Sequence, residues 1–191
     1  RQRPHDFAGA FLQIEPRPRA LLLFEYQSYL WNEGVKELLR DLLDPESLVS
    51  LRYQAGRLLF PRDALAEVLR RLRAQTFPLL APDSTYTDPA VEKAASTALT
   101  REGLRLTDLS LRAVPDLFFK HEERALLVVP GKLVVGRALR DEMNRGRQKV
   151  NVAFTLPPGA YATLVVKRLF WFAMIEEEVR DQGEVHPVAA R

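Results

Sequence analysis

The stretch 151–172, which reads NVAFTLPPGAYATLVVKRLFWF, most constrains how this chain can fold. Val152 and Phe154 alternate with more polar neighbours, which is the two-residue period of a half-buried β-strand. The LPPG segment at 156–159 then breaks the strand, because each proline fixes φ and lacks a backbone donor, whereas glycine permits conformations closed to other residues. From Ala160 the apolar residues recur at spacings of three and four. The stretch therefore predicts a strand, a rigid corner and a helix.

Two interpretations fit this pattern. The simpler one is a strand-to-helix corner inside a core, and the other is a corner that presents a backbone edge and Tyr161 to a ligand. The segment FTLPPGAYAT, followed by an aliphatic helix, resembles the closing motif of the TruD family of tRNA pseudouridine synthases, usually written F-x-LP-x-GSYAT. Ala160 stands where that family usually has serine. This resemblance favours the ligand-presenting interpretation.

Composition excludes several kinds of site. The chain of 191 residues has no cysteine, which rules out disulfides, thiolate catalysis and cysteine zinc sites. Its three histidines, His5, His121 and His186, are far apart in sequence, so we expect no metal site. The net charge of +3 is compatible with an anionic partner such as RNA without requiring one. A hydrophobic content of 47% is enough for one domain with a core or for two small ones.

The sequence also bears on location and completeness. No apolar run approaches the roughly 18 to 20 residues that span a bilayer, so we expect no membrane insertion. No secretory signal peptide opens the chain, which makes the cytoplasm the expected compartment. The first residue is Arg1 rather than methionine, and we therefore expect the chain to be a piece of something longer.

The first half of the chain predicts two helices around a hairpin. An extended or turn segment at 17–19 should precede a helix at 20–43, and alternating apolar residues predict a β-hairpin at 48–60. The segment 26–32, YQSYLWN, has the pattern of core aromatic packing, and it also resembles the A-x-QSYLFN stretch of TruD proteins. A helix at 64–75 carries Arg70, Arg71 and Arg73, which form either a solvated face or a phosphate-binding one.

The second half alternates helix and strand signals. Asp88 should cap a helix that begins at Pro89 and ends near Arg101. The apolar run 125–129 predicts a buried strand, and 133–135 predicts a further strand or an extension of it. The charged segment 137–148 predicts an exposed loop that either faces solvent or faces RNA.

The resemblance covers most of the chain and implies a particular α+β fold. The hairpin and the helix after it look like the place where TruD proteins interrupt their catalytic fold with an inserted domain. We therefore expect a helical inserted domain with a small hairpin at 1–122. Residues 123–191 would contribute strands and a closing helix to the mixed sheet of a pseudouridine synthase catalytic domain.

The resemblance also implies an activity. TruD-like enzymes convert a uridine in the D-arm region of tRNA to its C-glycoside isomer and are not known to need a cofactor. The chemistry requires a carboxylate at the ribose C1′ and a basic partner that keeps it ionised. The family's catalytic aspartate lies in a G-x-KD motif, and no aspartate of this chain has that context. We therefore predict that this chain alone does not catalyse the reaction, and that its partners are tRNA and the missing N-terminal half of the catalytic domain.

Site residues follow from the same resemblance and from clustered charge. We expect a wall of the uridine pocket at the 154–161 corner, and RNA contacts at the arginine clusters. An alternative function is a non-catalytic RNA-binding or protein-interaction module that reuses the fold, and an unrelated helical adaptor is disfavoured by the predicted strands. The expected pocket residues are Phe154, Leu156, Pro158, Gly159 and Tyr161, and the expected RNA-binding residues are Arg70, Arg71, Arg73, Arg145 and Arg147.

Overall fold

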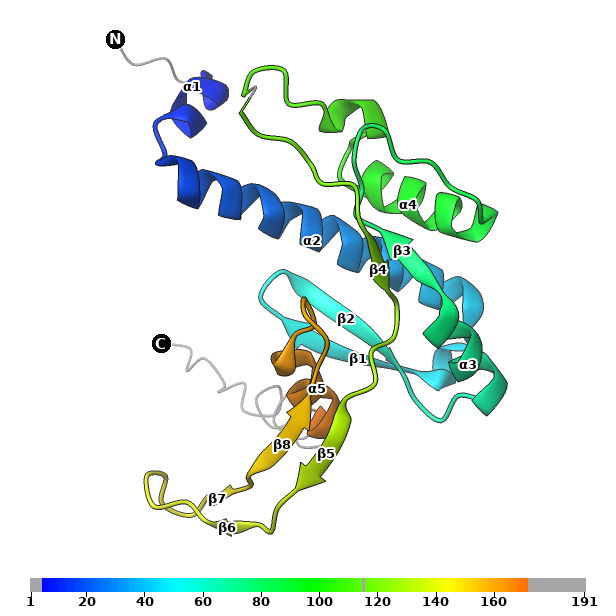
Figure 1. Ribbon diagram of the computed structural model, residues 1–191, viewed down its shortest axis with the longest axis vertical. Coiled ribbons are helices and arrows are strands. Elements are labelled where there is room, and N and C mark those ends of the chain that lie inside the picture. The colour runs from blue at the N-terminus through cyan, green and yellow to red at the C-terminus, as the bar shows by residue number, and fades with distance from the viewer. Residues whose placement is uncertain (1–4, 115, 172–191) are drawn as a thin grey trace, which may run out of the picture. The chain divides into compact units, whose positions relative to one another are not determined.

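The computed structural model describes residues 5–114 and 116–171 and divides the chain into two compact units (Figure 1). The N-terminal unit comprises residues 1–126 and the C-terminal unit residues 127–191. The described elements include five α-helices and four antiparallel strand pairs, so the predicted α+β class is confirmed. The expected identities of the two predicted domains stay a prediction.

The N-terminal unit is organised along helix α2 (Pro16–Leu42), which follows the short helix α1 (Phe7–Leu12). Helix α4 (Pro89–Arg101) packs along α2, as Figure 1 shows. Leu30 and Leu38 of α2 and Ala95 of α4 are fully buried in the core between the two helices. Small alanine side chains on α4 permit this close approach, and the aromatic ring of Phe77 fills the remaining space.

Helix α2 begins four residues before the predicted start at residue 20. Residues 17–19 were expected to be extended, but they form its first turn. Proline is tolerated there because the first backbone N–H groups of a helix have no intrahelical acceptor. Pro16 and Pro18 therefore do not delay the helix, and the expectation of an extended segment was wrong.

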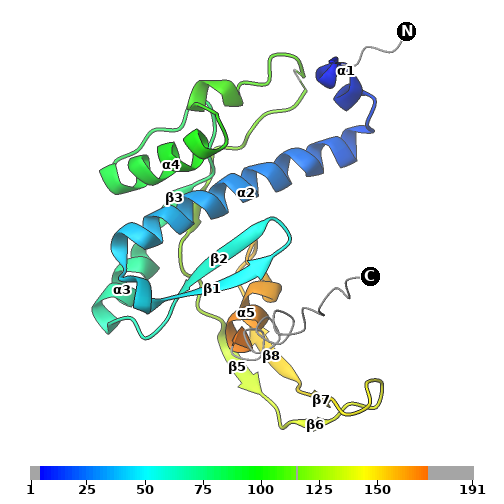
Figure 2. The same cartoon turned by 180° about the vertical axis from the view of Figure 1, so that it is seen from behind.

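The predicted hairpin is confirmed as strands β1 (Leu48–Tyr53) and β2 (Gly56–Pro61), seen from behind in Figure 2. A short 3-10 turn (Pro45–Ser47) links α2 to β1. Val49, Leu51 and Leu58 are buried and share one face of the hairpin, as the alternating pattern required. Gly56 has φ of 136°, a value that L side chains rarely adopt, and it closes the turn.

Four further described elements belong to the N-terminal unit. Helix α3 (Ala66–Ala74) follows the hairpin, and β3 (Thr76–Pro78) pairs antiparallel with β4 (Glu123–Ala125). A second 3-10 turn (Leu106–Leu109) follows α4. The Asp88 side chain accepts a hydrogen bond from the Ala90 backbone N–H at 2.8 Å, which confirms the predicted helix start.

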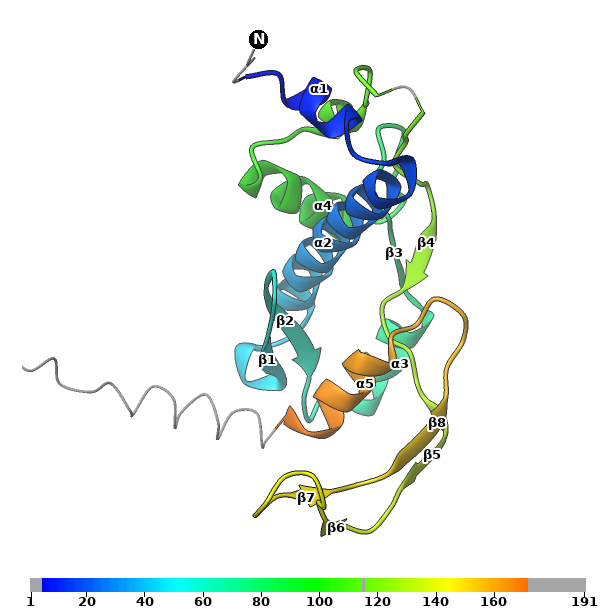
Figure 3. The same ribbon diagram turned by 90° about the vertical axis from the view of Figure 1, so that its left-hand side faces the viewer.

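The C-terminal unit is a long antiparallel hairpin followed by a helix (Figure 3). Strand β5 (Gly131–Val135) pairs with β8 (Val152–Thr155), and farther along β6 (Leu139–Arg140) pairs with β7 (Gln148–Lys149). Helix α5 (Ala162–Leu169) follows β8.

The predicted buried strand at 125–129 was wrong. Only its first residue, Ala125, lies in a strand, and the side chains of Val128 and Val129 are 39% and 54% exposed. This run crosses from one compact unit to the other, so its apolar residues do not share one sheet. The pairing partner of β8 is instead β5, whose residues 133–135 were predicted as a strand.

Candidate functional site

The corner between β8 and α5 is a type II β-turn. The Ala160 backbone N–H donates to the Pro157 carbonyl at 3.2 Å, and Gly159 has φ of 83°. A type II turn favours proline at its second position and requires positive φ at its third, which Pro158 and Gly159 satisfy. The Pro-Pro-Gly sequence therefore fixes the direction in which the chain leaves the strand.

Tyr161 follows this turn as the N-cap residue of α5. Its side chain makes no capping hydrogen bond and is 57% exposed. Phe154 and Leu156 are two residues apart and half-buried, whereas Pro158 and Gly159 are exposed. The corner thus has a partly buried apolar base with an exposed phenol beyond it.

Close backbone approach fixes the strand beside the corner. A Cβ at Gly131 would lie 2.6 Å from Thr155 Oγ1, and Thr155 is the residue paired with Gly131 across the two strands. The Gly136 backbone N–H donates to the Asn151 carbonyl at 2.8 Å. A larger side chain at Gly131 would therefore force the Thr155 side chain, at the end of β8 next to the corner, to move.

The predicted RNA-binding arginines fall into two groups. Arg70, Arg71 and Arg73 lie on α3 in the N-terminal unit and are all exposed. Arg70 forms an ion pair with Glu67, one helical turn earlier. Arg71 and Arg73 have no ion-pair partner among the described residues, although cations in the last turn also stabilise the helix dipole. On α3, Arg71 and Arg73 are therefore the exposed arginines whose charge is not paired with a described carboxylate.

The second group belongs to the loop between β6 and β7. Arg145 and Arg147 are exposed within this loop, residues 141–147. The Asp141 carboxylate organises the loop, because it accepts hydrogen bonds from the backbone N–H groups of Met143 at 2.9 Å and Asn144 at 3.2 Å. The Asn144 side-chain amide donates to the same carboxylate at 2.8 Å.

Nearby hydrogen-bond donors also lower the pKa values of the two carboxyl groups of the loop. The Asn144 side-chain hydrogen bond and the Met143 backbone N–H hold the pKa of Asp141 below its ordinary value. The ammonium group of Lys149 likewise lowers the pKa of Glu142, from which its Nζ lies 2.6 Å. Asp141 therefore has its partners inside the loop and Glu142 has its partner on β7, and Arg145 has no acidic partner among the described residues.

The structure also explains the aromatic segment of α2. Gln27 is buried and its Nε2 donates to the carbonyls of Leu80 and Lys120 at 3.0 and 2.7 Å. Trp31 Nε1 donates to the Phe77 carbonyl at 2.8 Å. The segment therefore has a structural role in the core, as its pattern favoured.

Tyr29 has a different polar partner from these core residues. Its hydroxyl donates to Glu102 Oε1 at 2.7 Å, which raises the pKa of Tyr29 above its ordinary value. Tyr26 stacks on Tyr29 with ring centroids 6.1 Å apart. These two phenols thus join the middle of α2 to the end of α4.

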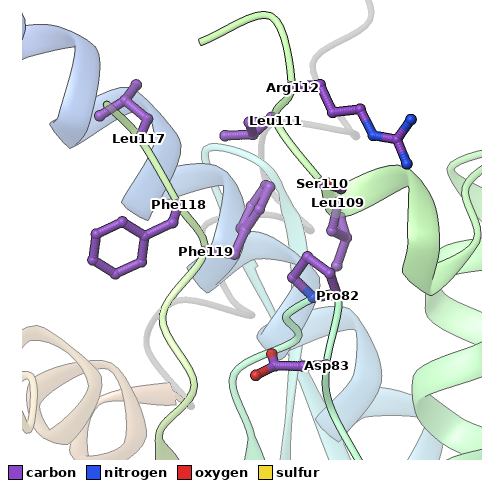
Figure 4. A pocket seen from close by; sticks show the side chains of 9 residues that line it. All are labelled: Pro82, Asp83, Leu109, Ser110, Leu111, Arg112, Leu117, Phe118 and Phe119. Atoms are coloured by element: carbon purple, nitrogen blue, oxygen red, sulfur yellow. The ribbon is translucent and has the colours of Figure 1, made fainter. Parts of the chain in front are cut away.

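The described part of the structure has two surface hollows that were not predicted from the sequence. One, in the N-terminal unit, has a volume of about 400 Å³ and lies between segments 109–112 and 117–119 (Figure 4). Phe118 is 69% exposed, and in Figure 4 its ring points away from Arg112. The other, of about 500 Å³, lies on the 141–147 loop and is lined by Arg140, Asp141, Glu142, Met143 and Arg145. Neither hollow is lined by the predicted pocket residues, and spacing in the sequence gives no signal for either.

Within 5–114 and 116–171, no three histidine, aspartate or glutamate side chains are grouped so as to hold a metal ion. None of the helices in this part of the chain is both long enough and apolar enough to cross a bilayer.

Comparison with known proteins gives one consistent family. The family model described as tRNA pseudouridine synthase D (TruD) matches residues 1–169. "Probable tRNA pseudouridine synthase D 2" of Methanocaldococcus jannaschii is 35% identical over 169 residues, which is 88% of this chain and 40% of that protein. "Probable tRNA pseudouridine synthase D 1" of Methanococcus maripaludis is 31% identical, over 87% of this chain and 42% of that protein.

A bacterial relative gives a similar coverage. "tRNA pseudouridine synthase D" of Leptospira interrogans is 25% identical over 166 residues, which is 85% of this chain and 40% of that protein. The chain thus spans about two fifths of the length of the curated relatives that it matches.

Proposed function

Because the chain belongs to the TruD family of tRNA pseudouridine synthases, we propose that it forms part of an enzyme that isomerises a uridine of tRNA to pseudouridine. The observation that carries this proposal is the β8–α5 corner, where a type II turn holds the FTLPPGAYAT motif and leaves Tyr161 exposed. The target uridine is one in the D-arm region, and the expected compartment is the cytoplasm. No cofactor is required.

The corner would serve as one wall of the uridine pocket. A base must leave its stack to react, and a pocket that receives it needs apolar and aromatic surface. Phe154 and Leu156 offer half-buried apolar surface, and the turn at Pro158 and Gly159 lets the RNA approach the backbone closely. Tyr161 offers both a ring and a hydroxyl to the uridine.

The rest of the catalytic site would come from sequence outside this chain. No aspartate here lies in a G-x-KD context, and the carboxylate at the ribose C1′ must therefore be supplied by the N-terminal half of the catalytic domain. The exposed apolar residues of β5 support this, since Leu133, Val134 and Val135 are 43%, 62% and 54% exposed. A two-stranded hairpin is marginally stable by itself, and a larger sheet would cover these residues.

The arginine clusters would bind the phosphate backbone. Arg71 and Arg73 on α3, and Arg145 in the 141–147 loop, are exposed cations without an acidic partner among the described residues. Arg70 and Arg147 belong to the same clusters, with Arg70 paired to Glu67. Such contacts give salt-sensitive affinity that is independent of sequence.

The test is pseudouridine formation by the full-length protein on an unmodified tRNA transcript. The reaction is an isomerisation and leaves the mass unchanged, so the nucleosides are separated by chromatography after digestion. We expect pseudouridine with the full-length protein and none with residues 1–191 alone. Addition of the N-terminal half as a separate chain should restore activity if the two parts fold together.

The outcomes separate the proposal from its alternative. A full-length protein that binds tRNA without forming pseudouridine would be a non-catalytic RNA-binding module, which the missing aspartate motif favours for this chain alone. Pseudouridine formation by residues 1–191 alone would mean that the essential carboxylate lies within this chain.

A further inference from the structure

The loop 141–147 exposes a large apolar side chain at its tip. Met143 is 87% exposed, more than any other large hydrophobic residue in the described part of the chain. A methionine side chain is flexible and polarisable and adapts to irregular surfaces, including ring edges. It lies in the loop that connects β6 to β7, and it is the large apolar side chain that this loop exposes.

The loop has a defined shape before any partner binds. Asp141 accepts two backbone hydrogen bonds and one side-chain hydrogen bond from Met143 and Asn144. The Asp141 backbone N–H donates to the Arg147 carbonyl at 3.0 Å, and the Arg147 N–H donates to the Asn144 carbonyl at 3.1 Å. Less conformational entropy is then lost when the loop binds a partner, because its backbone is already ordered.

The charge of this part of the chain is concentrated. The segment 137–149 contains four arginines and one lysine against Asp141 and Glu142, which gives 5 − 2 = +3, the same as the net charge of all 191 residues. Both acids already have partners, because Asp141 accepts from N–H donors of the loop and Glu142 accepts from Lys149 of β7. Arg140 and Arg145, which flank Met143, have no ion-pair partner among residues 5–114 and 116–171.

We propose that the 141–147 loop is an RNA-contact loop in which Met143 packs against the face of a nucleobase while Arg140 and Arg145 bind the flanking phosphates. The inference rests on the proposed function, which supplies RNA as the partner. The three side chains line one hollow of about 500 Å³ together with Asp141 and Glu142. Apolar surface between two cations matches a base between two phosphates, and apolar side chains are known to insert beside unstacked bases.

The choice of RNA over a protein partner follows from charge. Each arginine that contacts a phosphate contributes to a salt-dependent affinity, whereas the methionine contributes through contact area alone. A target base that leaves its stack exposes the faces of its neighbours, and Met143 would cover one of them. Asp141 acts as a positioning residue, since its carboxylate accepts the hydrogen bonds from Met143 and Asn144 that hold the loop.

The experiment compares variants of the full-length protein for binding to an unmodified tRNA transcript by fluorescence anisotropy, between about 50 and about 200 mM salt. We expect Met143→Ala to raise Kd by about five- to tenfold at every salt concentration without changing the slope of log K against log salt. Arg145→Ala should lower that slope by about 0.7 to 0.9. Leu21→Ala, which truncates a 58% exposed residue of α2, is the matched control and should leave Kd unchanged.

A second variant tests directly whether the side chain at position 143 contacts a nucleobase. Met143→Trp places an indole at the tip, and base stacking on it should quench its fluorescence when tRNA is added, relative to the same titration of the wild type. Absence of this quenching, or a Kd for Met143→Ala within twofold of the wild type, would overturn the inference. A lowered unfolding temperature for Met143→Ala with unchanged Kd would also overturn it, because the methionine would then pack on protein.

Failure of this inference can be told apart from failure of the proposed function. Pseudouridine formation by the wild type tests the function, and the two Met143 variants test the loop. An active wild type with insensitive Met143 variants leaves the function standing and removes only the loop contact. A wild type that neither binds nor modifies tRNA removes both.

Discussion

The side-chain amide of Gln27 pairs with the peptide of Lys120 in both directions. Its Nε2 donates to the Lys120 carbonyl at 2.7 Å, and its Oε1 accepts from the Lys120 backbone N–H at 3.3 Å. The same Nε2 donates to the Leu80 carbonyl at 3.0 Å. One buried glutamine of α2 therefore satisfies polar groups of two segments that are far apart in the sequence.

Replacement of Gln27 by leucine should destabilise the protein strongly. The change removes the donors to the buried Leu80 carbonyl and to the partly buried Lys120 carbonyl, and a buried acceptor left without a partner costs about 1–3 kcal/mol. We expect the free energy of unfolding to fall by about 2–4 kcal/mol, measured by urea denaturation. Gln54→Leu in the exposed β1–β2 turn is the control and should change it by less than about 0.5 kcal/mol. Equal stabilities of the two variants would show that the amide contacts have no net effect.

Alanine at Gly34 should destabilise α2, although alanine usually stabilises a helix interior by about 0.5–1 kcal/mol relative to glycine. A Cβ at this position would lie 2.4 Å from Cζ of Phe77, whose ring is fully buried. Overpacking of this kind costs about 1–3 kcal/mol, so the clash outweighs the helix propensity. The thermal unfolding temperature should fall.

A double-mutant cycle separates the clash from other causes. Phe77→Leu removes the ring atom that meets the new methyl group, and it should restore part of the stability that Gly34→Ala loses. Additive effects of the two changes would contradict the clash, since residues in contact are expected to couple.

The sequence predicted those elements whose patterns are local. The alternation of Val49, Leu51 and Tyr53 predicted the β1–β2 hairpin, and Asp88 followed by proline predicted the start of α4. The start of α2 was missed, because proline in a first turn has the same local sequence as proline in a loop before a helix.

Contacts between residues far apart in the sequence could not be predicted from local sequence patterns. The apolar run after Arg124 has the composition of a buried strand, yet Val129 is 54% exposed and the run is divided between the two compact units at residues 126 and 127. The role of Gln27 was also missed, since its partners Leu80 and Lys120 are 53 and 93 residues away.

The candidate site was predicted in part. The strand, turn and helix of the corner are confirmed, because two prolines and a glycine specify the turn locally. Which residues face the substrate stays a prediction. The segment 137–148 was predicted as an exposed loop, and this is wrong for Leu139, Arg140 and Gln148, which lie in the β6–β7 pair. Residues 141–147 do form an exposed loop, but its organisation around Asp141 depends on side-chain hydrogen bonds that residue spacing does not reveal.

Replacement of Arg71 and Arg73 by alanine should weaken tRNA binding mainly at low salt. Each lost phosphate contact should reduce the slope of log K against log salt by about 0.7 to 0.9. Arg40→Ala is the control, because Arg40 forms an ion pair with Glu37 on α2 and offers less free charge. An unchanged slope in the double variant would mean that α3 is a solvated face, which was the simpler interpretation of its sequence.

The order of the 141–147 loop should depend on pH through Asp141. Its pKa is lowered in the folded state by the Asn144 side chain and the Met143 N–H, so the ionised form stabilises the loop. This stabilisation is fully present above the ordinary aspartate pKa of about 3.9 and is lost as the pH falls through the lower folded value. Hydrogen exchange of the Met143 and Asn144 amides should therefore report weaker protection, relative to the intrinsic rate, only in acid.

Asp141→Asn provides the control for this titration. Asparagine keeps one acceptor oxygen for the two backbone N–H groups but has no carboxylate to protonate. Protection in this variant should be independent of pH over the same range. Loss of protection in acid to the same extent in the wild type and the variant would place the titrating group elsewhere.

Tyr161→Ala should impair catalysis by the full-length protein without destabilising it. The side chain is 57% exposed and caps nothing in α5, so its loss removes little from the fold. If the ring forms a wall of the uridine pocket, kcat/KM for tRNA should fall by about tenfold or more, which corresponds to about 1.4 kcal/mol of transition-state stabilisation. Tyr161→Phe keeps the ring and tests the hydroxyl separately. Val166→Ala, an exposed truncation on the same helix, should leave kcat/KM unchanged, and an equal loss in both alanine variants would mean that α5 as a whole, not Tyr161, shapes the pocket.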